Sequence, residues 1–388
     1  MRLAAVTSQF PVAGDPTRGR PIVQTLTALA KLVHVEVFVP NARYPRWLAP
    51  RSYHYGQPAD DMANVDGLTV HYLTYPTLPV VGRLVNGYSA GKSLRNPLLR
   101  YRPDVVLSYW LYPDAFGAAA VAHELGVPLV AGARGSDIRA RDRFSLALTR
   151  SVLTRSARIL TVSEDLRSIA IERFGASAER TSTIPNGCDT RIFRLADRSV
   201  ARAALGVPQD AKVILFVGRL VEAKGLRELM TAWLELARRE PRLRLTAVGQ
   251  GPLLAELASR AAAAQCAERF HAPGALAPSE VATWMQACDV FCLPSHTEGY
   301  PNVLVEALAS GRPVVATPVG GIKEIVDADN GVLTPVRDAS RLAAALSAAL
   351  SRQWDEAALS RRFARSWDEV ASETLAVCDG AWRDGANR

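Results

Sequence analysis

The segment from residue 289 to residue 326, DVFCLPSHTEGYPNVLVEALASGRPVVATPVGGIKEIV, constrains the fold more than any other part of this chain. The apolar run Val290–Leu293 is typical of a buried parallel strand. Pro301 suits the first position of a helix, because its missing N–H has no partner there, and Gly311 is placed to end that helix. A second apolar run, Pro313–Ala316, predicts another buried strand. The segment therefore predicts a strand–loop–helix–strand unit of a parallel sheet.

Two carboxylates in this unit are placed to reach one ligand. The loops at the carboxyl ends of parallel strands line the ligand crevice of such sheets, and Glu298 falls in one of these loops while Glu306 follows on the helix. Carboxylates accept hydrogen bonds from sugar and ribose hydroxyls, and the start of a helix suits a phosphate. A solvated pair of glutamates on an ordinary helix explains the same spacing.

The letters EGYPNVLVE, followed by ALASGRPVVATPVGG, resemble the donor-site signature of the family 4 glycosyltransferases, which are retaining enzymes of the GT-B fold. The resemblance implies that Glu298 lies beside the transferred sugar, that Glu306 binds the ribose hydroxyls, and that amides near Gly299 meet the phosphates. The donor-site residues implied in this segment are Glu298, Gly299, Tyr300, Pro301, Asn302 and Glu306.

A glycine-containing loop that carries two cations precedes this unit in the chain. Lys212–Val217 predicts a strand, and the letters GRLVEAKGL after it contain Arg219 and Lys224, which the family resemblance assigns to the diphosphate. An Arg fork and a Lys point charge can neutralise a leaving diphosphate without a metal. A surface ion pair of these cations with Glu222 or Glu228 is the alternative. The expected nucleotide-lining glycines are Gly218, Gly249 and Gly251.

The first half of the chain opens with the same kind of unit. Arg2–Val6 predicts a strand, Pro21 to about Leu32 a helix, and Val33–Val39 a second strand, as in a doubly wound sheet. The family resemblance places paired glycines in the first loop to approach the donor. Here only Gly19 occupies that place.

The letters SYWLYPDAFG resemble a subset of the family in which a strand ends in a His-Trp pair before a Tyr-Pro-Asp run. Tyr109 stands at the histidine position, followed by Trp110 and Asp114, and retaining chemistry in this fold needs no obligatory protein base. Asp114 is also suited to cap the next helix. The loop ARGSDIR adds Arg134 and Asp137 on the side expected to face the acceptor, and the irregular, aromatic segment 43–100 is a further acceptor-binding candidate.

The letters TIPNGCDTRIF are similar to a hinge motif of the family, which places a domain boundary near Asp189. The expected architecture is therefore α/β: an N-terminal Rossmann-like acceptor domain over 1–189, a C-terminal nucleotide-sugar domain over 190–365, and a helix over 366–388 that returns to the first domain. In the GT-B fold that this resemblance implies, the two doubly wound domains face each other across a cleft that holds the active site.

Charge is unevenly distributed along the chain. Residues 1–190 contain 22 Lys and Arg against 15 Asp and Glu, a surplus of +7, while the whole chain carries +8. Many of these cations are the arginines between Arg134 and Arg158. Such a surplus favours an anionic membrane surface or a phosphorylated acceptor, although a solvated surface explains it equally well. No helix-turn-helix, zinc-finger or RNP-like motif accompanies the charge, so nucleic acid is not an expected partner.

Several other classes are excluded by the sequence. The pair Asp327 and Asp329 precedes an Asn-Gly turn signal, the histidines lack ligand spacing, and no Cys-x-x-Cys pair occurs, so no metal or other cofactor is expected. The loop GDPTRGRP lacks the Gly-x-Gly-x-x-Gly pattern of nicotinamide enzymes. With no signal peptide and no long apolar stretch, the chain is expected to be cytoplasmic, or peripheral on the inner face of the cell membrane.

Together these features predict a retaining glycosyltransferase of the hexosyltransferase type. It would move a sugar from a nucleoside-diphosphate sugar to an acceptor hydroxyl on a glycan or lipid-linked molecule, in cell-surface polysaccharide or glycolipid assembly. The alternative is a catalytically silent subunit that keeps the fold and the nucleotide-sugar site, as Tyr109 at the histidine position allows.

Overall fold

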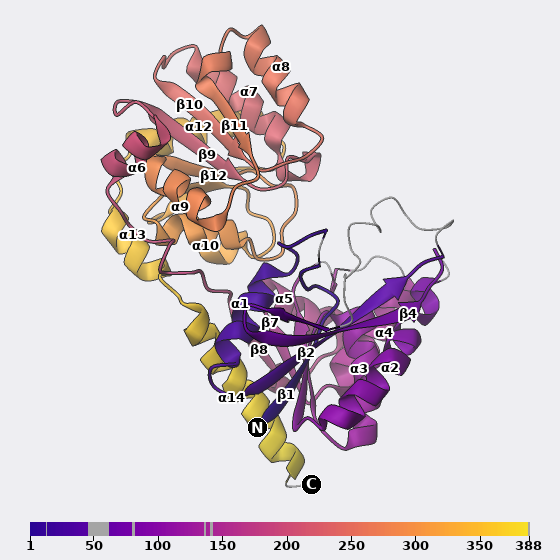
Figure 1. Cartoon of the computed structure of the whole chain (residues 1–388). Coiled ribbons are helices and arrows are strands. Elements are labelled where there is room, and N and C mark those ends of the chain that lie inside the picture. Colours follow the sequence, from indigo (N-terminus) through magenta and orange to yellow (C-terminus); the bar gives the residue numbers. More distant parts are fainter. Residues whose placement is uncertain (13, 46–61, 80–81, 136, 140–142, 387–388) are drawn as a thin grey trace. The chain divides into compact units, whose positions relative to one another are not determined.

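The computed structural model describes residues 1–12, 14–45, 62–79, 82–135, 137–139 and 143–386 (Figure 1). The chain divides into two compact units. Unit 1 consists of Met1–Asn186 and Trp367–Arg388, and unit 2 consists of Gly187–Ser366. The last helix of the chain therefore belongs with the first sheet.

Unit 1 is organised around a single sheet that comprises, in the described residues, eight strands in the order β3-β4-β2-β1-β5-β6-β7-β8. All neighbouring strands are parallel except the edge pair β3 and β4. The strands are β1 (Arg2–Val6), β2 (His34–Arg43), β3 (Met62–Val65), β4 (Leu68–Pro76), β5 (Val105–Tyr109), β6 (Leu129–Ala133), β7 (Arg158–Thr161) and β8 (Thr181–Thr183).

Helices cover both faces of this sheet, so its central strands are apolar throughout. The helices and helical turns are α1 (Arg20–Leu29), α2 (Gly82–Tyr101), η3 (Leu111–Ala115), α3 (Phe116–Leu125), α4 (Arg143–Arg155), α5 (Glu164–Ser168), η4 (Ile169–Arg173), η5 (Ala178–Arg180) and α14 (Trp367–Ala386). On one face, α14 packs on α1, and Trp367, Val370 and Leu26 belong to the same buried cluster. On the other, α2 and α3 pack side by side (Figure 1).

Unit 2 repeats this plan with a six-stranded parallel sheet, over its described residues, in the order β11-β10-β9-β12-β13-β14. Its strands are β9 (Lys212–Val217), β10 (Leu243–Val248), β11 (Phe270–Gly274), β12 (Val290–Leu293), β13 (Val314–Ala316) and β14 (Gly331–Leu333). Its helices and turns are α6 (Arg198–Leu205), η6 (Glu222–Lys224), α7 (Leu226–Ala237), α8 (Leu254–Ala263), η7 (Ala267–Arg269), α9 (Pro278–Ala287), α10 (Asn302–Ala309), α11 (Ile322–Ile325), α12 (Ala339–Ser351) and α13 (Glu356–Phe363).

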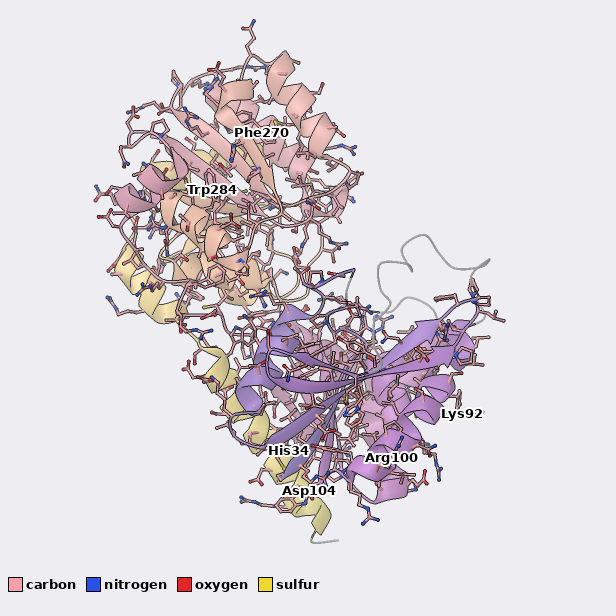
Figure 2. The ribbon with its side chains drawn as sticks, in the orientation of Figure 1. His34, Lys92, Arg100, Asp104, Phe270 and Trp284 are labelled. Atoms are coloured by element: carbon pink, nitrogen blue, oxygen red, sulfur yellow. The ribbon has the colours of Figure 1, made fainter. Side chains whose placement is uncertain are left out.

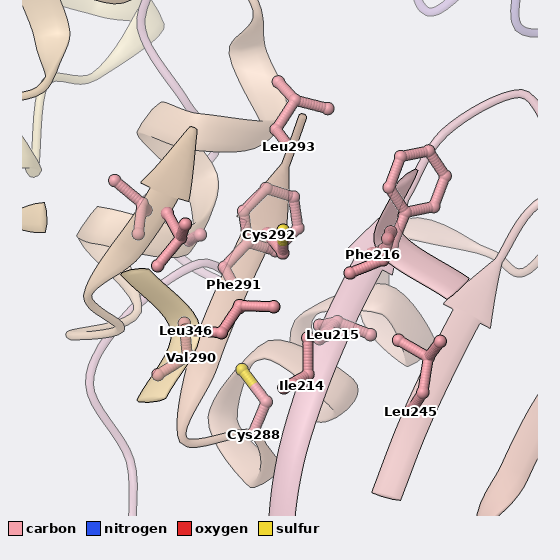
Figure 3. Packing of buried hydrophobic residues seen from close by; sticks show 14 of the residues in the cluster. Ile214, Leu215, Phe216, Leu245, Cys288, Val290, Phe291, Cys292, Leu293 and Leu346 are labelled. Carbon is pink, nitrogen blue, oxygen red and sulfur yellow. The ribbon is translucent and has the colours of Figure 1, made fainter. Parts of the chain in front are cut away.

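The core of unit 2 is centred on the strand expected to precede the glutamate loop. Leu215 on β9 pairs in register with Phe291 on β12, and both side chains are fully buried. Figure 3 shows them with Leu346 from α12 and Leu245 from β10. Because β12 is covered on both faces, the residues after Leu293 leave the core at a fixed point on the edge of the sheet.

Most predicted elements are confirmed, and several boundaries are the predicted ones. β1, β9 and β12 have the expected residues. Ser163 caps α5 by accepting a hydrogen bond from the Leu166 amide at 3.2 Å. The assignment of Pro301 to the first helical position is wrong. Its backbone is extended (φ −80°, ψ 102°), so it is the N-cap residue and α10 begins at Asn302.

Candidate functional site

The carboxyl edge of the unit 2 sheet gathers the sequence-predicted donor residues. Four neighbouring parallel strands, β10, β9, β12 and β13, all end at this edge, because parallel strands share their direction. The loop after β9 contains Arg219 and Lys224, and the loop after β12 contains Glu298. Residues far apart in the chain are therefore brought to one rim by sheet topology.

An ion pair joins two of these loops directly. Lys224 Nζ donates to Glu298 Oε1 at 2.5 Å, and the two side chains are only 21% and 10% exposed. The alternative partners expected for Lys224 are engaged elsewhere: Glu222 pairs with Arg227, and Glu228 Oε1 lies 2.9 Å from His296 Nε2. Because the two side chains are shielded from solvent, dissolved salt weakens their attraction much less than it weakens that of a surface ion pair.

The loop that carries Glu298 is held by contacts that the sequence pattern did not reveal. Buried Ser295 donates from its hydroxyl to Glu298 Oε1 at 2.6 Å, and its carbonyl accepts from Thr317 Oγ1 at 2.5 Å. The His296 amide donates to the Ala223 carbonyl at 2.8 Å, next to Lys224. These contacts fix both partners of the ion pair. The only signal in the sequence is a run of polar residues directly after a buried strand.

Two glycines allow the loops to approach this closely. A Cβ on Gly225 (φ 68°) would lie 2.0 Å from the Pro294 carbonyl oxygen, and a Cβ on Gly320 (φ 55°) would lie 2.2 Å from the Glu298 carbonyl oxygen. The Gly321 amide also donates to the Gly299 carbonyl at 2.8 Å. Only glycine fits both the backbone conformation and the space at these positions.

The other predicted donor residues lie in the loops around the ion pair. Arg219 is exposed, and no side-chain partner is found for it among the described residues. The next residue of its loop is tied to the following glycine turn, because the Leu220 amide donates to the Gln250 carbonyl at 2.8 Å. The glycines of these two loops are Gly218, Gly249 and Gly251.

Beyond Glu298, the signature continues into α10. The side chain of Tyr300 is half-buried. Burial raises the pKa of its phenol to about 12, so the phenol stays neutral. Asn302 opens α10, and Glu306 lies half-buried on the same helix. The carbonyl of Glu306 accepts from the Ser310 amide, so Glu306 stands near the carboxyl end of the helix rather than at its amino end.

In unit 1, a buried carboxylate organises the predicted acceptor loops. Asp137 accepts hydrogen bonds from the amides of Gly135 at 2.8 Å, Arg134 at 3.0 Å and Leu111 at 3.3 Å. It thereby joins the loop after β5 to the loop after β6. Burial raises the pKa of Asp137, and these amides oppose that shift.

Tyr109 supports Arg134 and is itself a core residue. Its ring is 3% exposed and packs in the cluster that includes Val370 of α14. The guanidinium carbon of Arg134 lies 4.6 Å from the centre of that ring, and Arg134 Nη1 donates to Asn186 Oδ1 at 2.9 Å. Arg134 Nη2 is buried and has no hydrogen-bond partner among the described residues.

Asp114 does not cap a helix, contrary to the expectation. It lies inside η3, and Ala115 is the N-cap of α3. Its Oδ2 instead accepts from the Ser8 amide at 2.5 Å, which ties it to the loop after β1. Burial raises its pKa to about 7, and its Oδ1 has no partner among the described residues.

The remaining unit 1 candidates have mixed outcomes. Gly19 is the N-cap of α1, where a Cβ would lie 2.0 Å from the Gln9 carbonyl oxygen, so packing alone accounts for this glycine. Trp110 is half-buried, with a positive φ of 109°. Within the segment 43–100, residues 46–61 and 80–81 lie outside the described residues. The described part lines a cavity of about 500 Å³ with Tyr44, Leu78 and Val85 among its walls.

Neither a metal-binding cluster nor a membrane-spanning helix is found in the described part of the chain. No group of three or more His, Cys, Asp or Glu side chains there could hold a metal ion. No helix there combines the length and apolar character needed to cross a bilayer. Asp327 instead accepts from the Asp329 amide and pairs with Arg362, as expected of a turn.

Two family models match the chain in succession. Residues 19–192 match the model described as Glycosyltransferase Family 4, and residues 211–352 match the model described as Glycosyl transferases group 1. The D-inositol 3-phosphate glycosyltransferase of Frankia alni is 35% identical over 271 residues, which cover 64% of this chain and 65% of the relative. The chain thus spans just under two thirds of that relative. TuaC of Bacillus subtilis, named as a putative teichuronic acid biosynthesis glycosyltransferase, is 26% identical over 89% of this chain and 88% of its own.

Solved structures with the same fold cover the whole chain. Sucrose-phosphate synthase from Thermosynechococcus elongatus aligns over 100% of this chain and 98% of its own, with a TM-score of 0.71 and 21% identity. HepE of Anabaena, solved in complex with UDP, aligns over 100% of both chains with a TM-score of 0.70 and 20% identity. At these identities the match concerns the fold alone.

Replacing Gly320 by Ala tests the close approach of the loops in unit 2. We expect Gly320→Ala to lower the free energy of unfolding of unit 2 by about 1–2 kcal/mol for the left-handed backbone, with a further loss from the contact with the Glu298 carbonyl. Gly206→Ala is the matched control, since Gly206 has a similar φ of 67° and a Cβ added there would meet nothing within 4 Å. Urea unfolding that shows equal losses for both variants would contradict the packing argument.

The buried Asp114 predicts a pH dependence of stability. Its pKa is about 7 in the folded protein, against an ordinary value of 3.8, so the native state holds a proton that the unfolded state releases. The free energy of unfolding should therefore fall as pH rises from about 4 to about 7, by roughly 4 kcal/mol at most, since one pKa unit corresponds to about 1.4 kcal/mol. Chemical unfolding across this range should show a shallower pH dependence in Asp114→Asn. An unchanged dependence would show that Asp114 does not titrate there.

Proposed function

We propose that this chain, which belongs to the glycosyltransferases, transfers a sugar from a nucleoside-diphosphate sugar to an acceptor hydroxyl with retention of anomeric configuration. A Family 4 domain is followed in it by a group 1 domain, and the fold is GT-B. The observation that carries the proposal is the shielded contact of Lys224 with Glu298 at the carboxyl edge of the unit 2 sheet. It joins a cation suited to a diphosphate with a carboxylate suited to a sugar hydroxyl.

In the proposed donor complex, the diphosphate lies against Arg219 and Lys224. Arg219 is exposed and has no ion-pair partner in the described part of the chain, so binding a phosphate costs it no existing ion pair. Lys224 can turn from Glu298 to a phosphate oxygen, which frees Glu298 to accept from a sugar hydroxyl. The amide of Asn302, at the start of α10, supplies a further phosphate donor, and Glu306 receives the ribose hydroxyls.

The proposed transfer requires no metal, because two protein cations supply the charge that a departing diphosphate needs. As the leaving oxygen separates from the anomeric carbon, negative charge builds on the diphosphate. Arg219 and Lys224 meet that charge, and Glu298 keeps the sugar oriented. The acceptor oxygen bonds to the anomeric carbon from the same face while its proton passes to the departing diphosphate oxygen.

The acceptor side of the proposal rests on unit 1. Trp110, Arg134 and Asp137 lie in loops at the carboxyl edge of its sheet, and the buried Nη2 of Arg134 is available for an acceptor oxygen. Tyr109 acts through Arg134, on whose guanidinium its ring packs. Asp114 holds the first loop through Ser8. The proposed acceptor is a glycan or lipid-linked molecule in polysaccharide or glycolipid assembly, for which the teichuronic acid in the name of TuaC is the support. A lipid-linked acceptor would bring the protein to a membrane surface.

A catalytically silent nucleotide-sugar-binding subunit is the second proposal, favoured by one observation. The position that the family resemblance gives to a histidine is occupied by Tyr109, whose ring is in the core. Such a subunit would bind the nucleotide sugar and neither hydrolyse nor transfer it. Incubation of the purified protein with UDP-glucose, GDP-mannose and ADP-glucose, with and without EDTA, separates the two proposals by release of the nucleoside diphosphate. UDP-glucose is tested first because the Anabaena neighbour was solved with UDP.

Replacing Lys224 by Ala tests the donor site. We expect transfer by Lys224→Ala to fall by about 10²–10³ in kcat, as for the loss of one charge-stabilising group, with the fold unchanged. The measurement is the initial rate of nucleoside-diphosphate release with whichever donor the wild type uses. Arg238→Ala is the control, since Arg238 is an exposed cation after α7. Near-normal turnover of Lys224→Ala would overturn the assignment.

A further inference from the structure

A large groove on unit 1 has no individually predicted site residue in its lining, and it shares no lining residue with the cavity of Tyr44, Leu78 and Val85. It has a volume of about 1270 Å³ and is bordered by α2, α3, the end of α4 and the end of α14. Its floor is shaped by glycines of α2 and α3: a Cβ on Gly117 would lie 2.7 Å from the Gly91 amide nitrogen, so the two helices touch along their backbones. The groove is thus built by the fold itself.

The groove carries a surplus of positive charge. Its described lining includes the five cations Lys92, Arg95, Arg155, Arg158 and Arg180 and the two carboxylates Glu124 and Asp384. Both carboxylates are already paired, Glu124 with Arg95 and Asp384 with Arg158. Lys92 and Arg155 have no partner among the described residues, and Arg180 only donates to the Ser156 carbonyl at 3.4 Å. An anionic partner is therefore favoured.

The face of α2 beside the groove is also apolar in its first turns. Leu84, Val85 and Tyr88 are 44%, 47% and 60% exposed. The positions Leu84, Tyr88, Lys92 and Arg95 recur at spacings of four, four and three residues, so they lie on one face of the helix. Lys92 is labelled on this helix in Figure 2. One helix face thus changes from apolar to basic along its length.

The supporting structure indicates that Tyr88 is held in this exposed position. Its ring meets the ring of Phe116 edge to face, with 5.1 Å between the centroids. Tyr88 therefore packs on Phe116 and is exposed to solvent, next to aliphatic side chains and cations. This combination fits a membrane interface, where apolar side chains enter the headgroup region and cations contact lipid phosphates.

We propose that this face of α2, with the groove behind it, docks unit 1 on an anionic phospholipid surface. The groove cations contact the lipid phosphates, and Leu84, Val85 and Tyr88 enter the headgroup layer. A second copy of this chain is disfavoured, because a self-complementary contact would bring the same surplus of positive charge together. An acidic glycan is disfavoured, because it offers no apolar surface against which the exposed Leu84 and Val85 could be buried. The proposal locates the membrane association that the proposed function implies, and its test does not depend on sugar transfer.

The test is co-sedimentation of the full chain with vesicles. We expect binding to vesicles of equal parts phosphatidylglycerol and phosphatidylcholine, little binding to phosphatidylcholine alone, and weaker binding as salt rises. The double variant Lys92→Glu/Arg155→Glu should bind the anionic vesicles at least about 25-fold more weakly, since each basic residue at such a surface contributes about fivefold. Leu84→Ser/Tyr88→Ser should also bind more weakly, with the salt dependence kept.

The control is Arg238→Glu/Arg239→Glu, which makes the same charge change on exposed cations of unit 2 and should bind as the wild type does. Wild-type binding by Lys92→Glu/Arg155→Glu would overturn the proposal, as would equal loss in the control pair. Two further results would overturn it: binding of soluble polygalacturonate in preference to vesicles, and a dimer in solution that Lys92→Glu/Arg155→Glu dissociates. Release of nucleoside diphosphate by Lys92→Glu/Arg155→Glu with a soluble acceptor should equal the wild-type rate, so vesicle binding and transfer can fail separately.

Discussion

The contact between Lys224 and Glu298 is the interaction on which the unit 2 site depends. Both groups sit in loops that follow adjacent strands of a parallel sheet, and each loop is fixed by backbone contacts to the other. A diphosphate sugar offers a replacement partner to each of the two groups, a phosphate for Lys224 and a hydroxyl for Glu298. Under the proposed function, the pair already holds together the two groups that such a ligand needs.

Unit 1 uses buried carboxylates for a different purpose. Asp137 and Asp114 accept backbone amides from loops that follow different strands, so each carboxylate joins segments that are far apart in the chain. The amides given to Asp137 offset part of the cost of burying its charge. Burial raises the pKa of Asp114 to about 7, and the hydrogen bond from the Ser8 amide opposes that shift. Hydrogen bonds to Asp137 hold the loop around Arg134, while the guanidinium retains a donor with no partner among the described residues.

The charge surplus of the N-terminal half is resolved by the structure into separate roles. Some arginines are paired within unit 1, as Arg95 and Arg158 are, and others such as Arg155 have no partner within the described chain and line the groove. Net charge along the sequence could not distinguish these groups, because pairing depends on which helices are neighbours. The sequence likewise did not predict the exposed apolar turns of α2, because Gly, Pro and Arg are distributed throughout that helix.

The sequence by itself determined the α/β class, the strands β1, β9 and β12, and the grouping of Arg219, Lys224, Glu298 and Glu306 in loops and a helix after parallel strands. These follow from apolar runs, glycine and proline positions, and a local signature, all of which are properties of short segments. The tertiary structure decided which side chains meet. Lys224 pairs with Glu298 and not with the nearby Glu222 or Glu228, Tyr109 packs in the core, and Asp114 binds Ser8 and not the end of a helix. The contact of Lys224 with Glu298 joins residues 74 positions apart, and the contact of Asp114 with Ser8 joins residues 106 positions apart. Strand order and glycine-permitted loop packing set these distances, and no local pattern encodes either of them.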